Sequence, residues 1–262
     1  MENPAGVYTA RQKDGTVYYR SSITIHGRHI SLGSFATAGE AGKAYDEAHM
    51  LYASEMTIDS YSDDFILPFK KYVSLINYRD NGIYFKTPVY IYRKYFTYYL
   101  SPSYSLKFDV DDLFYYSTRS IMQRGGHIFV SDFGMQVNIL SRYGIRGHAV
   151  CGRDYYFANG DGCDYRYGNL IIVNPYHGVR HFVKDGRDYY KVKIHINGDY
   201  VVGTYRSKTE AAIAYNKAAD ILRSNGCKKS FPENYPESLN ASDYASIYDS
   251  VKISRKIREY RF

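Results

Sequence analysis

Residues that could hydrolyse a phosphodiester gather between positions 155 and 173, in a segment rich in asparagine, glycine and aspartate. Such hydrolysis needs oxygen ligands for a divalent cation and a base that activates water. The candidates are Asn159, Asp161 and Asp164 as metal ligands, with His148 or His177 as the base. Loops of this composition are more often plain turns, so we favour a turn here and a hydrogen-bonded hairpin histidine at His148.

A second kind of chemistry, the binding of a polyanion, is indicated by the charge. The 262 residues include 34 Lys and Arg against 27 Asp and Glu, a formal net charge of +7. An excess of positive charge favours nucleic acid as a partner. The chain also has 32 tyrosines and no tryptophan. Tyrosine suits strands and base stacking alike, and a low-GC coding bias produces the same composition.

Other classes of protein fit the sequence less well. No run approaches the ~20 apolar residues of a membrane span, and the N-terminus does not resemble a signal peptide. We therefore expect no membrane partner and a cytoplasmic protein, associated with the nucleoid in a prokaryote. Cys151, Cys163 and Cys227 include no CxxC pair, which predicts reduced structural thiols. We expect no metal and no cofactor.

An internal repeat relates the two ends of the chain. The matched segments are Gly6-Val7 with Gly178-Val179, Asp14-Gly15 with Asp185-Gly186, Ile23 to Gly27 with Ile194 to Gly198, Leu32 to Phe35 with Val202 to Tyr205, and Glu40 to Asp46 with Glu210 to Asn216. The two glycine turns of each copy predict three antiparallel strands. Thr37-x-x-Glu40 and Ser207-x-x-Glu210 are capping boxes, and the alanines that follow at helical spacing predict a helix against the sheet.

The repeat resembles the Apetala-two/ethylene-response-factor DNA-binding domain, through its Gly-Val start, its Leu-Gly-x-Phe segment and its Glu-Ala-x-x-Ala-Tyr-Asp helix. The resemblance implies that the exposed sheet face enters the major groove of duplex DNA. In the second copy it implies contacts from Arg180, Phe182, Lys184, Lys191, Lys193 and His195. In the first copy the matching positions are Tyr8, Ala10, Gln12, Ser22, Thr24, His29 and Ser31, with charge only from the flanking Arg11, Lys13, Arg20 and Arg28. We therefore expect the first copy to bind more weakly.

The stretch 155–173 resembles the HNH endonuclease motif of homing enzymes, which often carry an Apetala-two-like domain just downstream. The matching residues are Gly160, Arg166, Asn169, Leu170 and Val173. The motif's metal ligand and catalytic histidine, however, fall on Tyr156 and Phe157, and phenylalanine can be neither base nor ligand. We interpret the domain as HNH-like and inactive, with Arg142, Arg146, Arg153 and Arg166 implied to hold phosphates.

These observations predict an α+β protein. Two modules, each a three-stranded antiparallel sheet plus a helix, at 1–60 and 177–240 flank an HNH-like ββα domain at 61–176. Residues 54–64 are expected to form a linker, and 241–262 a basic tail or solvated helix. Asp111 to Tyr116 predicts a short helix, and the runs around 86–102 predict strands.

We expect a sequence-preferring double-stranded-DNA-binding protein, for example a transcriptional regulator, derived from a homing-endonuclease-like ancestor and without nuclease activity. One alternative is an active metal-dependent HNH endonuclease or nickase, and another is an RNA-binding or structural protein whose tyrosines stack on bases. Either a monomer or a homodimer agrees with the sequence.

Overall fold

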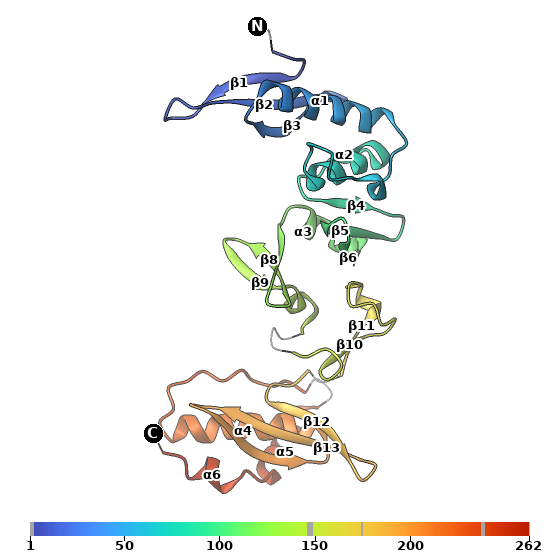
Figure 1. Ribbon diagram of the computed structural model, residues 1–262. Helices are drawn as coiled ribbons and strands as arrows, with labels where there is room; N and C mark the ends of the chain where they lie inside the picture. Colours follow the sequence, from blue (N-terminus) through green and yellow to red (C-terminus); the bar gives the residue numbers. More distant parts are fainter. Residues whose placement is uncertain (1–2, 146–148, 174, 237–238, 262) are drawn as a thin grey trace. The chain divides into compact units, whose positions relative to one another are not determined.

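The computed structural model describes residues 3–145, 149–173, 175–236 and 239–261. It has mixed α+β architecture with several small three-stranded antiparallel sheets (Figure 1). The chain forms two compact units, Met1–Tyr143 with Phe157–Leu170, and Gly144–Tyr156 with Ile171–Phe262. Within the described ranges, no helix is both long and apolar enough to cross a membrane.

The first copy of the repeat forms the predicted meander. Strands β1 (Val7–Arg11), β2 (Val17–Ile25) and β3 (Arg28–Phe35) pair in the order β1-β2-β3, and α1 (Ala38–Ala53) packs against them. The capping box at the start of α1 is complete. The Glu40 amide donates to Thr37 Oγ1 and the Thr37 amide donates to the Glu40 carboxylate, each at 3.1 Å. These bonds satisfy amides that the first helical turn leaves unpaired.

The second copy repeats this arrangement with β12 (Val179–Lys184), β13 (Arg187–His195), β14 (Asp199–Tyr205) and α4 (Lys208–Ser224). Its helix start differs in detail from the predicted capping box, because Ser207 Oγ accepts from the Thr209 amide at 3.1 Å. Both sheets carry a register shift at the same repeat position, after Ser21 and after Val192. The equivalence of the two copies therefore extends to an irregularity of the backbone.

The recurring Gly-Val signature has a steric cause. Gly6 and Gly178 both have a φ of 69°, in the left-handed region where glycine carries no Cβ penalty. A Cβ at Gly6 would lie 2.1 Å from a ring carbon of Tyr45, and one at Gly178 would lie 2.4 Å from the matching carbon of Tyr215. The glycine before the first strand and the tyrosine on the helix thus form one packing contact, which explains why they recur together.

The expected linker at 54–64 is packed into the first unit. The Glu47 carboxylate on α1 accepts from the amides of Ile66 and Leu67 at 3.0 and 2.9 Å. Ile58 is buried in the same core as the first sheet, and Tyr78 donates its hydroxyl hydrogen to the Ile25 carbonyl. The first module therefore shares its core with the segment that follows it.

That following segment contains a helix that local preferences did not predict. Helix α2 (Phe69–Asn81) ends at Gly82, whose φ of 70° is typical of a helix C-terminus. The Asp80-Asn81-Gly82 sequence, although its composition is typical of a hairpin turn, is thus the end of this helix. Seven consecutive residues of α2, from Tyr72 to Tyr78, are buried.

The rest of the first unit contains two further sheets and several short helices. Strands β4 (Val89–Ile91), β5 (Tyr95–Ser101) and β6 (Tyr104–Asp109) form one sheet, and β7 (Ile121–Arg124), β8 (His127–Asp132) and β9 (Met135–Asn138) form the other. Along the chain, the 3-10 helix η2 (Val110–Asp112) and helix α3 (Leu113–Ser117) follow β6 and precede β7. They form where the sequence predicts a short helix. The 3-10 helix η3 (Ile139–Tyr143) follows β9.

Residues 155–173 form only part of the ββα arrangement that the resemblance to the HNH motif implies. Strands β10 (Tyr155–Phe157) and β11 (Leu170–Ile172) pair, with the 3-10 helix η4 (Tyr167–Asn169) just before β11. The described residues between β11 and β12 contain no helix. The ββα prediction therefore differs from the structure in its third element.

The C-terminal segment, expected to be a tail or a solvated helix, packs onto the second module. Helices α5 (Ala241–Ser250) and α6 (Arg255–Arg258) lie against α4, with Val251, Ile253 and Ile257 buried in the module's core. The Ser254 amide donates to the Val202 carbonyl of edge strand β14 at 2.8 Å. The basic side chains of this segment remain at the surface.

Two asparagines attach this extension to the repeat. Asn216 on α4 exchanges two hydrogen bonds with the backbone of Asn234, at 2.8 and 2.9 Å. The Asn234 side chain in turn accepts from the His177 amide at 2.6 Å and donates to the His177 carbonyl at 3.1 Å. Both asparagines are buried, so each bond replaces one that water would otherwise make.

We predict that Asn234→Ala lowers the free energy of unfolding of the second unit by roughly 1–3 kcal/mol, because it leaves buried polar groups without partners. Limited proteolysis should cut the variant earlier than the wild type within residues 239–261. The matched control is Asn240→Ala, since Asn240 is exposed and its side chain bonds only to Asp243 within α5. Equal resistance of the Asn234 variant and the wild type would contradict this role.

Candidate nucleic-acid interface

The predicted contact residues of the second module lie on one face of its sheet. Cross-strand pairs join Arg180 with Lys191, and Phe182 with Tyr189. Because side chains alternate between faces along a strand, all four point away from α4. Beyond the register shift, Lys193 and His195 remain on this face and are exposed. Their neighbours on β13, Val192 and Ile194, are buried on the opposite face.

This face is strongly basic. Its Lys and Arg side chains are Arg180, Lys184, Arg187, Lys191, Lys193 and Arg206, of which Arg187 and Arg206 were not among the predicted contacts. The acidic residue on the described strands of this face is Asp199. Arg187 could have been found from the hairpin, since it pairs with Lys184. Arg206 could have been found because it directly follows β14, at a position where the alternation of side chains along a strand predicts an orientation toward the exposed face.

Asp199 lies among the cations at one end of the face. Its carboxylate is 2.9 Å from His195 Nδ1 and 3.8 Å from Lys193 Nζ. The hydrogen bond with His195, together with the charge of Lys193, lowers the pKa of the Asp199 carboxyl below its ordinary value. All three side chains are about half exposed, so water screens this cluster and leaves it accessible to a ligand.

The opposite end of the face is aromatic. The rings of Phe182 and Tyr189 stack with centroids 5.6 Å apart and an interplanar angle of 17°. The Arg206 guanidinium lies 4.2 Å from the centre of the Tyr189 ring. An apolar surface bordered by arginine suits contact with a thymine methyl group or an unstacked base.

The first module presents a weaker version of this face. Tyr8, Arg20, Thr24, His29 and Ser31 are exposed on the side of the sheet away from α1. Among the strands β1 to β3, Arg20 is the basic residue of that face, and its guanidinium donates to Tyr18 at 2.7 Å.

The other predicted residues of this module lie elsewhere. Ser22 is 7% exposed, which leaves its hydroxyl little surface for a ligand. Arg28 has the opposite orientation from the exposed face and lies 5.8 Å from the Tyr84 ring centre. Arg11 and Lys13 are exposed at the β1–β2 hairpin.

The predicted phosphate contacts of the middle segment pair with aspartates of the protein itself. Three guanidinium groups bind carboxylates that are mostly or fully buried: Arg142 binds Asp112, Arg153 binds Asp154, and Arg166 binds Asp164. Arg142 also lies 4.3 Å from the Tyr115 ring centre. Arg146, the fourth predicted contact, and His148 lie outside the described residues. These ion pairs reduce the charge that the three arginines can offer a phosphate.

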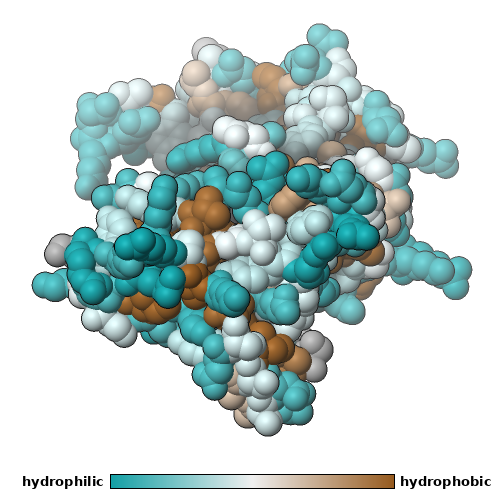
Figure 2. Space-filling view, turned by 90° about the horizontal axis from the view of Figure 1, so that it is seen from below, coloured by the Kyte–Doolittle hydropathy of each residue, from teal (hydrophilic) through white to brown (hydrophobic). Residues whose placement is uncertain are grey.

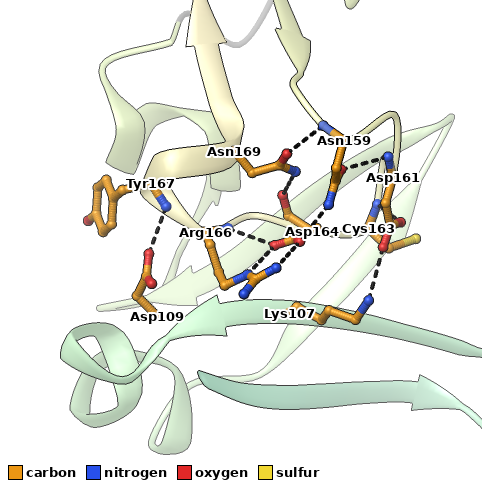
Figure 3. Close-up of polar contacts among 9 residues, drawn as sticks. All are labelled: Lys107, Asp109, Asn159, Asp161, Cys163, Asp164, Arg166, Tyr167 and Asn169. Atoms are coloured by element: carbon orange, nitrogen blue, oxygen red, sulfur yellow. Dashed lines mark hydrogen bonds and ion pairs between the residues drawn. The ribbon is translucent and has the colours of Figure 1, made fainter. Parts of the chain in front are cut away.

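The asparagine- and aspartate-rich loop has a structural hydrogen-bond network, which Figure 3 shows. Asn169 accepts from the Asn159 amide at 2.9 Å and donates to the Asp164 carbonyl at 2.8 Å. The fully buried Asp164 carboxylate accepts from Asn159 Nδ2 at 2.9 Å and from Arg166 Nε at 2.8 Å. Asp161 pairs with Lys107 at 3.1 Å. The side chains proposed as metal ligands therefore hold the loop closed in this structure.

Other features of this segment bear on catalysis. Tyr156 is exposed, and the Phe157 ring packs edge-on against Tyr165 with centroids 5.4 Å apart. Over the described part of the chain, no group of three or more His, Cys, Asp or Glu side chains is placed to hold a metal ion. His177 donates its amide to Asn234 in the second unit.

The Asp164 carboxyl should make stability depend on acid. Burial alone would raise its pKa, but the hydrogen bonds and charge of Arg166, together with Asn159, lower the pKa below the ordinary value of 3.8. A carboxyl with a lowered folded-state pKa stabilises the protein above its unfolded pKa and loses that effect as the pH falls through the folded value. We predict that the first unit loses stability below a pH of about 4, and that Asp164→Asn weakens this pH dependence.

The same variant should be less stable at pH 7 by roughly 1–3 kcal/mol, because Arg166 and Asn159 lose their charged acceptor. Urea unfolding between about pH 2 and 7 measures both effects. Asp111→Asn is the matched control, since Asp111 is exposed in the same unit. An unchanged pH profile for Asp164→Asn would show that this carboxyl does not govern acid stability.

Comparison of the chain with models of protein families, with curated proteins and with solved structures gives no significant match.

In the view of Figure 2, hydrophilic residues cover most of the visible surface and hydrophobic residues form small patches among them.

Proposed function

We propose that this protein binds double-stranded DNA with sequence preference, through the exposed face of strands β12 to β14. The observation that carries the proposal is the charge of that face, where six Lys and Arg side chains accompany one aspartate. Cations spaced along a sheet can neutralise phosphates while neighbouring side chains contact base edges in the major groove.

The proposal includes an origin for the chain. The resemblance of the repeat to the Apetala-two type of domain, and of residues 155–173 to the HNH motif, supports descent from a homing-endonuclease-like ancestor. The steric link between Gly178 and Tyr215 and the shared register shift support the equivalence of the two copies. Phe157 at the position of the catalytic histidine supports a protein that binds without cleaving.

The two modules would contribute unequally to DNA binding. The first module offers Arg20 on its exposed face, with Arg11 and Lys13 at its hairpin, so we assign it an auxiliary contact. The second module would provide most of the phosphate neutralisation. Linking two modules in one chain raises the local concentration of the weaker one at the DNA.

Selection of bound duplexes from a random DNA pool tests this function. Enrichment of a motif, with affinity that falls steeply as salt increases, is the expected result. The selected duplex is then incubated with the protein in magnesium or manganese, where it should stay intact. Recovery of no motif would contradict sequence preference. Strand breaks would favour the endonuclease, and displacement of the duplex by single-stranded RNA would favour the RNA-binding alternative.

A further inference from the structure

A groove in the second unit extends beyond the sheet face. Its volume is about 770 Å³. Basic side chains on its walls come from the sheet and from two segments outside the sheet: Arg180, Lys191, Lys193 and His195 from β12 and β13, and Arg153 and Lys229 from elsewhere. Asp154 and Asp199 are the aspartates in its lining. The groove is therefore a concave site with a clear excess of positive charge.

Lys229 is held beside the groove by the chain on both sides of it. Before it, the Cys227 amide donates to the Leu222 carbonyl at the end of α4, at 3.0 Å. After it, Phe231 is buried in the module's core and Asn234 makes the buried bonds to Asn216. Lys229 Nζ itself donates to the Ile196 carbonyl at 3.3 Å. The backbone at Lys229 is thus fixed, and its exposed ammonium group can exchange this carbonyl for a stronger acceptor.

Arg153 contributes from another segment of the same unit. Its Nε and Nη2 atoms bind the Asp154 carboxylate, and its side chain is 43% exposed. Asp154 is anchored in turn, because it accepts from the Val150 amide at 2.9 Å. An arginine oriented by a carboxylate presents its accessible edge in a fixed direction, which suits an anion with several oxygens.

We infer that this groove binds phosphates of one DNA strand, with Lys229 as a phosphate-contacting residue outside the sheet. The inference rests on the proposed function and adds a second, sequence-independent contact to it. The groove has the size of a site for a small ligand, so it takes a short part of one strand and not the whole duplex. Lysine provides a point charge without base selectivity, which fits a contact to the backbone.

The test uses the 262-residue chain with Lys229→Gln and the neighbouring Lys228→Gln as its matched control. Lys228 is exposed but does not line the groove, and its loss changes the net charge equally. Binding of the selected duplex and of a scrambled duplex is measured by fluorescence anisotropy across a salt series. Loss of one phosphate contact should weaken both complexes by roughly 3- to 10-fold and reduce the salt slope by about 0.9. Lys228→Gln should stay within about twofold of the wild type.

Each other outcome has a defined meaning. If Lys229→Gln binds like Lys228→Gln while Lys191→Gln still weakens binding, the phosphate contact is overturned and the proposed function stands. If the wild type binds no duplex, the proposed function fails, and this inference fails with it. Inorganic tripolyphosphate serves as the free-phosphate probe. Binding of the probe that depends on Lys229, with DNA binding unaffected by Lys229→Gln, would assign the groove to a free phosphate ligand and overturn the strand contact.

Discussion

Replacing Lys191 and Lys193 together with glutamine is expected to weaken binding of the selected duplex by roughly 10- to 100-fold near 0.1 M salt. Both lysines lie on the exposed face of β13, and both also line the basic groove. Each neutralised phosphate contributes about 0.9 to the salt slope, so the slope should fall by about 2 if both lysines contact phosphates. Fluorescence anisotropy over a range of salt concentrations measures both quantities.

A control must separate the contribution of this face to DNA binding from the contribution of the protein's net charge. Lys252 and Lys256 are exposed on the C-terminal segment, and replacing both with glutamine removes the same charge. We expect that control to retain most of the affinity. If it loses as much affinity as the Lys191 and Lys193 double variant, general attraction explains binding and the assignment of the sheet face is contradicted. Circular dichroism of both variants checks that the second unit remains folded.

The elements of the repeat could be predicted because their signals are local. Asp14-Gly15 and Asp185-Gly186 mark hairpin turns, and the bonds between Thr37 and Glu40 span three residues. Local signals need no knowledge of the rest of the fold. The role of Gly6 could be noticed only through its repetition, since its partner Tyr45 is distant in the sequence and the contact exists only once the helix packs on the sheet.

The missed elements depend on tertiary packing. Helix α2 contains Tyr72, Val73, Ile76 and Tyr78, residue types that favour strands, yet all are buried in a core shared with the first sheet. Burial on this scale outweighs differences of a few tenths of a kcal/mol in helix propensity. The C-terminal segment similarly looks like a basic tail by composition, but its apolar residues at 251, 253 and 257 are buried beneath exposed charges.

Part of the candidate site was also predictable, because some of its residues follow a local pattern. Alternation along β12 and β13 is a local pattern, and it selected residues that do lie on one face. Pairing of Arg142 with Asp112 is not local, because the two residues are 30 positions apart. Arg153 and Arg166 pair with aspartates one and two positions away, but that proximity alone does not show that the side chains meet. Lys229 also escaped selection, since only the fold brings the loop after α4 to the groove beside β13. Charge counts cannot distinguish a lysine that faces a ligand from an arginine already paired inside the protein.

Gly178→Ala is expected to destabilise the second unit by about 2–5 kcal/mol. The left-handed conformation costs an alanine roughly 1–2 kcal/mol, and crowding of a packed contact costs typically 1–3 kcal/mol more. The crowding arises because the new Cβ would lie 2.3 Å from the Lys193 carbonyl oxygen and 2.4 Å from the Tyr215 ring. Hydrogen exchange of the β13 amides measures the loss in this unit alone.

The matched control is Gly186→Ala in the hairpin turn of the same sheet. Gly186 has the same φ of 69°, but a Cβ there would meet nothing within 4 Å. Only the conformational cost should remain, so the difference between the two variants isolates the contact with Tyr215. Equal destabilisation would mean that the glycine serves the backbone turn alone. Gly6→Ala should destabilise the first unit as much as Gly178→Ala destabilises the second. Tyr45 takes the place of Tyr215 there, so the repeat preserves this contact as well as the sequence.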